Sequence, residues 1–153
     1  MKFGTLRRPL LGLLALAWLL GVAHADNRFT VSANGQEVVD TKSGLTWRRC
    51  SEGQTWSGST CTGSAGFFTF AQALTRAQTQ TGWRLPNLKE LGALADKGRN
   101  DPAIDTTAFP GTPSEWFWTS TPLEGSPGYA WGVDFYSGNT NIRSDGLRLR
   151  LVR

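Results

Sequence analysis

The chain has 153 residues and a formal net charge of +4, but three of its 16 Lys and Arg residues and its only His lie in the first 25 residues, where none of the 12 Asp and Glu residues occurs. The rest of the chain carries 13 basic against 12 acidic side chains, a balance that gives no support for a nucleic-acid partner. Without histidine it cannot use a Ser-His-Asp or Cys-His mechanism, and it lacks the commonest metal ligand.

Residues 1–25 have the three-part pattern of a cleaved secretory signal peptide. Basic residues come first, residues 9–22 are apolar, and small residues follow at the cleavage positions. The apolar run would rise only about 21 Å as a helix, less than the roughly 30 Å hydrocarbon core of a bilayer. The sequence therefore predicts export to a secreted or periplasmic location, no membrane span after cleavage, and one mature domain over 26–153.

Short strands are predicted at the start of this domain, over 29–33, 37–39 and 45–47, around turn signals at 34–35 and 41–44. After the loop between the two cysteines, the apolar residues recur at the spacing of a helix.

Two helices are predicted after these strands. Thr69 opens a capping box for the first helix, which we expect to end near Gly82. Asn87 and Glu90 repeat the capping pattern for the second helix, which we expect to end near Gly98.

The two cysteines, Cys50 and Cys61, close a short polar loop. In an oxidising compartment an isolated pair of this kind favours a structural disulfide. A redox pair usually has two residues between its cysteines, and a metal site would lack histidine partners, so both alternatives are weaker.

A connected motif links the two predicted helices and consists of Trp83, Arg84, Pro86, Asn87 and Glu90. Core filling by the tryptophan, helix capping by the asparagine and glutamate, and an ion pair from the arginine account for it without any ligand. The motif is therefore interpreted as one that specifies the fold.

A long loop is predicted over 99–115, because this stretch is rich in Pro, Asp, Thr and Gly. Antiparallel strands are predicted after it, over 116–119, 129–136, 140–143 and 147–152. Strands, two helices and more strands define an α+β domain.

Several of these segments together resemble the Lcl C-terminal domain family, named for the C-terminal domain of the Legionella collagen-like adhesin. The resemblance extends from about Val38 to Arg153 and rests on Gly44-Leu45-Thr46-Trp47, the loop between the cysteines, Trp83-Arg84-Leu85-Pro86-Asn87-Leu88-Lys89-Glu90-Leu91, Phe117-Trp118-Thr119-Ser120-Thr121, Ala130-Trp131-Gly132-Val133-Asp134-Phe135 and Arg150-Leu151-Val152-Arg153.

The resemblance implies a C-type-lectin-like architecture, with two helices flanked by a twisted antiparallel sheet and a long irregular loop. It also implies an extracytoplasmic binding module of the adhesin type, because the namesake domain binds sulfated glycosaminoglycans. The expected partners are sulfated or acidic glycans or a cell-envelope protein. A structural or assembly role in a pilus or envelope complex is the alternative.

Arginines on the last predicted strand are the candidate ligand-binding residues. Period two sends the Leu residues of 147–152 to one face and Arg148 and Arg150 to the other, where Arg143 of the preceding strand joins them. Guanidinium groups on one exposed face would bind sulfate or carboxylate through paired donors. An ordinary solvated face, or ion pairs with Asp134 and Asp145, would explain the same pattern.

The sequence predicts neither a cofactor nor a metal site. Oxygen ligands for calcium do occur at Asp134, Asn139, Asn141 and Asp145, but these residues lie around turns where Asn and Asp are expected. Formylglycine-generating enzymes have a similar scaffold, yet they need a C-terminal cysteine pair that this chain lacks. A glycoside hydrolase would need two spaced carboxylates, and no spacing indicates them. We therefore expect a non-enzyme.

Overall fold

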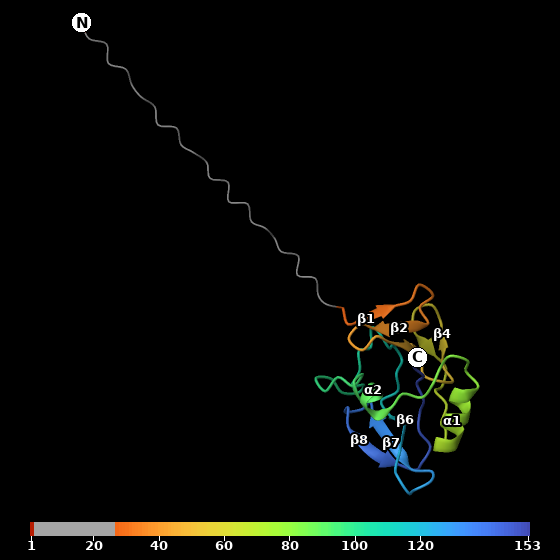
Figure 1. Cartoon of the computed structure of the whole chain (residues 1–153). Helices are drawn as coiled ribbons and strands as arrows, with labels where there is room; N and C mark the ends of the chain where they lie inside the picture. The colour runs from red at the N-terminus through yellow and green to blue at the C-terminus, as the bar shows by residue number, and fades with distance from the viewer. Residues whose placement is uncertain (2–26) are drawn as a thin grey trace.

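The computed structural model describes Met1 and residues 27–153, so the predicted signal peptide otherwise lies outside the described residues (Figure 1). A group of strands, two helices and a second group of strands follow one another in the predicted order, which confirms the α+β class. The elements are β1 Phe29–Val31, β2 Glu37–Asp40, β3 Leu45–Arg48, β4 Thr55–Trp56, β5 Cys61–Thr62, α1 Phe70–Gln78, α2 Leu88–Gly92, β6 Trp116–Pro122, β7 Ala130–Asp134 and β8 Thr140–Arg143. No helix among the described residues is long and apolar enough to cross a membrane.

The strands form three antiparallel sheets, with the orders β1-β2-β3, β4-β5 and β6-β7-β8. The first and third sheets lie toward opposite ends of the molecule (Figure 1). The turn between β1 and β2 needs glycine, since Gly35 has a φ of +73° and a Cβ there would lie 2.6 Å from the indole nitrogen of Trp56. This contact brings β4 against the first sheet.

The C-terminal segment, residues 147–153, connects these parts through the middle of the molecule. Its carbonyl groups accept hydrogen bonds of 2.9–3.0 Å from the amides of Phe68, Trp118, Arg48 and Arg84. It is therefore bonded to the loop before α1, to β6, to β3 and to the loop before α2. The strand predicted over 147–152, with one exposed face, is therefore replaced by isolated β-bridges, and the segment has hydrogen-bonded neighbours on both edges.

The buried side chains form two clusters, and β6 lies between them. Phe117 points into one cluster and Trp118 into the other, as expected for neighbouring residues of a strand. Both residues are fully buried, so each face of this strand is covered. The first cluster contains Phe29, Val38, Trp47, Leu91, Leu94, Ile104, Ala108, Phe109, Phe117, Val133, Phe135 and Val152. The second contains Ala73, Ala77, Trp83, Leu85, Trp118, Ala130, Leu147, Leu149 and Leu151.

Both capping boxes were predicted correctly, but both helices end earlier than expected. Helix α1 is capped at Thr79, and Gly82 takes its positive φ of +76° in the turn that follows. Helix α2 is capped at Ala93 because the chain then turns toward the long loop, where the Asp96 amide donates to the carbonyl of Ala103 at 2.9 Å.

Candidate functional site

The prediction that Arg148 and Arg150 share one exposed face is wrong, because Arg150 is fully buried. The period-two alternation itself holds, since Leu147, Leu149 and Leu151 all enter the second cluster. The opposite face of the segment is covered as well, by residues of the first cluster. The Arg150 guanidinium lies over the rings of Phe109 at 4.8 Å and Phe117 at 6.0 Å.

Arg150 is held by four oxygen acceptors from two parts of the chain, residues 48–51 and Thr112. It donates to the carbonyls of Arg48, at 2.8 Å, and of Arg49, and to the hydroxyls of Thr112 at 2.7 Å and Ser51 at 3.3 Å. Burial lowers the pKa of Arg150 to about 9, so the side chain is still cationic at neutral pH. Its side chain therefore joins these segments inside the fold and is not available to a ligand.

The other two predicted arginines are already paired with carboxylates. Arg148 is mostly buried, forms an ion pair with Glu115 and lies over the ring of Phe67. Arg143 forms an ion pair with Asp145, as the alternative interpretation of the sequence expected, and its side chain is 29% exposed. The hydrogen bond from Arg143 lowers the pKa of Asp145. The positive charges of these two arginines are therefore already balanced by neighbouring carboxylates.

Arg48 differs from the other arginines of the described chain. The others have partners: Arg28 with Asp40, Arg76 with Glu52, Arg84 with Glu90, Arg99 with Asp96, Arg143 with Asp145, Arg148 with Glu115 and Arg153 with Glu37, while Arg49 and Arg150 donate to backbone and hydroxyl oxygens. No hydrogen bond or ion pair within residues 27–153 is made by the Arg48 guanidinium, and its Nε is buried without a partner.

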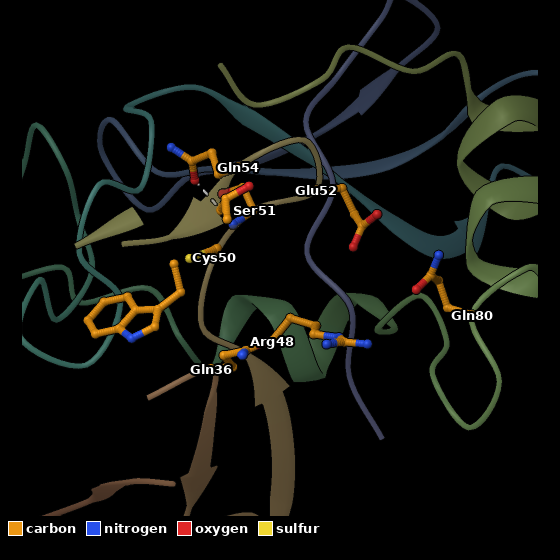
Figure 2. Close-up of a pocket in the computed structure, with 9 residues that line it drawn as sticks. Gln36, Arg48, Cys50, Ser51, Glu52, Gln54 and Gln80 are labelled. Carbon is orange, nitrogen blue, oxygen red and sulfur yellow. Dashed lines mark hydrogen bonds between the residues drawn. The ribbon is translucent and has the colours of Figure 1, made fainter. Parts of the chain in front are cut away.

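Arg48 lines a concave polar pocket of about 200 Å³, called here the Arg48 pocket. It extends from β3, where its amide donates to the carbonyl of Leu151 and its own carbonyl accepts from Arg150. Its guanidinium lies 4.3 Å from the ring centre of Trp83. Figure 2 shows this side chain directed toward the part of the pocket where Glu52 and Gln80 lie. The remaining lining residues are Gln36, Cys50, Ser51, Gln54, Thr55 and Trp56.

Polar side chains of the pocket divide into fixed and unengaged groups. Gln54 is fixed, because it accepts from the Ser51 amide at 3.2 Å (Figure 2) and donates to the carbonyl of Gly111 at 2.9 Å. The side-chain amides of Gln36 and Gln80 make no hydrogen bond within the described residues. The pocket thus offers one guanidinium and two amides to a ligand.

The charge around the pocket is positive, because Arg48 has no carboxylate partner and neither do its neighbours Arg49, which lies over Trp56, and Arg150, which donates to Ser51. Glu52 lines the pocket, but it is paired at 2.8 Å with Arg76. Arg153, which also lies over Trp83, is paired with Glu37. The charge of Arg48 therefore has no counterpart nearby. An unpaired guanidinium in a concave site suits one carboxylate or sulfate group, because its donors match two oxygens of such an anion.

The wall of this pocket is fixed by the disulfide bond between Cys50 and Cys61, which confirms the predicted pairing. The Cα atoms are 5.4 Å apart, and the bond closes the loop that contains β4. Cys50 lines the pocket itself. A disulfide fits an oxidising, extracytoplasmic compartment.

The motif between the helices has the structural role that the sequence predicted. Trp83 belongs to the second cluster, and Pro86 is buried. Asn87 and Glu90 form the capping box of α2. Arg84 donates two hydrogen bonds of 2.8 Å to the Glu90 carboxylate. The same glutamate therefore serves the helix cap and an ion pair.

Changing Glu90 to Gln is expected to lower stability by about 1 kcal/mol at pH 7, and this difference should be smaller at about pH 3. The hydrogen bonds from Arg84 and then from the Asn87 amide lower the pKa of Glu90 below its usual value of 4.5. The ion pair therefore stabilises the fold fully above that value and is lost as the pH falls through the folded pKa. Urea unfolding at the two pH values measures this, and an equal difference at both would contradict it.

The oxygen-rich turn that could have held calcium is used by the fold. The Asp134 carboxylate accepts hydrogen bonds of 2.9 Å from the Tyr136 amide and the Ser137 hydroxyl. Asp145 is engaged by Arg143. Within residues 27–153 no group of three or more His, Cys, Asp or Glu side chains is arranged to hold a metal ion.

The sheets, the disulfide loop and the polar pocket define a small disulfide-linked α+β module with a concave polar surface. The chain belongs to the Lcl C-terminal domain family, whose sequence model matches residues 36–153, and this is an adhesin-type family. No curated protein and no solved structure matches the chain.

Sequence reasoning missed Arg48 as a candidate. It stands beside Arg49 at the end of a predicted strand, and nothing local distinguishes the two. Arg49 donates to the carbonyls of Ala108 at 2.9 Å and Thr107 at 3.0 Å, far along the chain. The strand alternation was the only usable signal, because it sends neighbouring side chains to opposite sides.

Proposed function

We propose that the protein is an exported, non-enzymatic binding module that recognises one anionic group, a sulfate or carboxylate of a glycan or an acidic group on a protein surface. The observation that carries this proposal is the unpaired Arg48 guanidinium in a concave polar pocket. The adhesin-type family supports a role in attachment. The mature domain begins near residue 26 and is secreted or periplasmic.

The same proposal assigns the chain a C-type-lectin-like architecture. In chain order, two helices separate the first two antiparallel sheets from the third, and a long loop separates α2 from β6. In this arrangement the Arg48 pocket lies where β3, the disulfide loop and the end of α1 meet.

A binding role is favoured over hydrolysis by the state of the carboxylates. A general acid in a glycosidase needs a raised pKa. Hydrogen bonds from arginines instead lower the pKa of Glu90 and of Asp145, which line two other concave parts of the surface. Glu52 in the Arg48 pocket is paired with Arg76.

Replacing Arg48 with Gln is expected to weaken binding to heparin oligosaccharides about ten-fold, which corresponds to the loss of one charge-assisted contact. Binding of the parent protein should also weaken with added salt. Titration calorimetry on the mature protein measures both effects, and circular dichroism checks that the variant is folded.

The matched control is Arg148→Gln, which removes the same charge from an arginine that is already paired with Glu115. We expect this variant to bind heparin as the parent protein does. Equal affinity of the parent and the Arg48→Gln variant would remove Arg48 from the proposal. Equal losses in both variants would reduce the effect to overall charge and would also contradict it.

A further inference from the structure

A second concave site, separate from the Arg48 pocket, lies at the third sheet and is called here the Phe67 groove. It has a volume of about 390 Å³ and is bounded by the loop before α1, the start of β6, and the ends of β7 and β8. Two aromatic side chains at its edges are strongly exposed, Phe67 at 62% and Tyr136 at 52%. Exposed apolar side chains that gather around one concave site indicate a binding surface, whereas singly scattered ones do not.

The charged groups of this groove are neutralised by one another. Arg143 donates from Nε to the Asp145 carboxylate at 2.9 Å and from Nη2 to its second oxygen. Glu115 is paired with Arg148. The one other charged residue that lines the groove, Asp134, is acidic. The site therefore has no free cation, and an anionic ligand would gain little there.

The ion pair also fixes polar groups in a defined geometry. Two hydrogen bonds hold the Arg143 guanidinium against both oxygens of the Asp145 carboxylate, and the guanidinium lies 4.9 Å from the ring centre of Trp116. The Nη1 group of Arg143 makes no hydrogen bond within the described residues. A ligand hydroxyl can accept from this donor and donate to a carboxylate oxygen, with little loss of side-chain freedom on binding.

Phe67 is held in place from one side. The guanidinium of Arg148 lies 3.5 Å from its ring centre, and Arg148 is fixed by Glu115. The ring is therefore positioned although it is exposed. An exposed, positioned ring next to paired donors and acceptors matches a sugar, which has apolar C–H groups on one face of its ring and hydroxyls around its edge.

We propose that the Phe67 groove binds one neutral pyranose residue of a glycan, with the sugar ring stacked on Phe67 and its hydroxyls bonded to the Arg143 and Asp145 pair. This site goes beyond the proposed function, since Arg48 has no part in it. The protein would then have two sites of different chemistry, one for an anionic group and one for a neutral sugar.

The test is an array of neutral oligosaccharides, followed by saturation-transfer NMR and calorimetry with the neutral oligosaccharide that gives the strongest signal. We expect at least one neutral oligosaccharide to bind, with an affinity that changes less than about two-fold between about 50 and about 500 mM NaCl. Phe67→Ala and Asp145→Asn should each weaken this binding at least about ten-fold.

Two control variants separate this site from the rest of the surface. Tyr129→Ala removes an exposed ring, 45% accessible, that does not line the groove, and Arg48→Gln changes the anion site. Both should keep the parent affinity for the neutral sugar. No binding of any neutral oligosaccharide, or unchanged affinity in Phe67→Ala, would overturn the inference. Loss of heparin binding in Arg48→Gln stands independently of either result.

Discussion

Replacing Arg150 with Ala is expected to lower the free energy of unfolding by about 4 kcal/mol, although the residue lies on a segment whose sequence predicts an exposed face. The substitution leaves two backbone carbonyls and the hydroxyls of Ser51 and Thr112 without their donor. It also leaves a void against the rings of Phe109 and Phe117. Buried unsatisfied groups and a cavity are both large destabilising effects.

Urea unfolding followed by tryptophan fluorescence measures this loss. Two further variants separate the effect of lost volume from that of lost hydrogen bonds and provide a control. Arg150→Met fills most of the volume without donors, and we expect it to cost about 2 kcal/mol. Arg99→Ala removes an exposed arginine paired with Asp96, and we expect less than about 1 kcal/mol. A loss below about 1 kcal/mol in Arg150→Ala would mean that relief from burying a charge compensates for the lost hydrogen bonds.

Arg150 also connects stability with the proposed binding site. Two of its acceptors are the carbonyls of Arg48 and Arg49, at the end of β3. A third, Ser51, lines the Arg48 pocket. The buried cation therefore fixes the backbone from which the ligand-binding cation extends. We expect folded Arg150→Met to bind heparin more weakly than the parent protein, even where Arg48 is intact.

The local features of the fold could be predicted from the sequence. Both capping boxes depend on residues three positions apart, Thr69 with Gln72 and Asn87 with Glu90. The hairpin turns depend on glycines such as Gly35 within a few residues. In each case the groups that make the structure are neighbours in the chain, so propensity and spacing contain the information.

The environment of the C-terminal segment could not be predicted in the same way. Period two correctly separates Leu149 from Arg150, but it does not tell which side meets solvent. That depends on partners far away in sequence, because Arg150 contacts the carbonyl of Arg48 across 102 residues and Thr112 across 38. The first buried cluster occupies the side where the sequence pattern predicts water.

The candidate site was missed for a related reason. Which arginine stays unpaired depends on where every acidic residue lies in the fold. Arg148 and Arg143 appeared available in the sequence, yet Glu115 and Asp145 occupy them. Arg48 carries no motif, and its distinction is only that no acceptor within the described chain reaches it. The family resemblance and the arginine pattern therefore gave the expected ligand chemistry, but the position of the candidate residue had to come from the structure.

The second large effect is expected from the disulfide. Changing Cys50 and Cys61 together to Ser should lower the free energy of unfolding by about 3 kcal/mol, because a bond across 11 positions restricts the unfolded chain. Urea unfolding measures the loss. A reducing agent should destabilise the parent protein by a similar amount and leave the double variant unchanged. Equal stability of the parent protein and the variant would contradict this.

The consequence for binding follows from where the bond lies. Cys50 is in the wall of the Arg48 pocket, two positions after Arg48, and the loop that the bond closes supplies Gln54 and Trp56 to the same wall. Reduction should therefore weaken heparin binding under conditions where the domain is still folded. The Phe67 groove is built from other segments, so its affinity for a neutral sugar should persist. Parallel loss at both sites would instead indicate that reduction unfolds the whole domain.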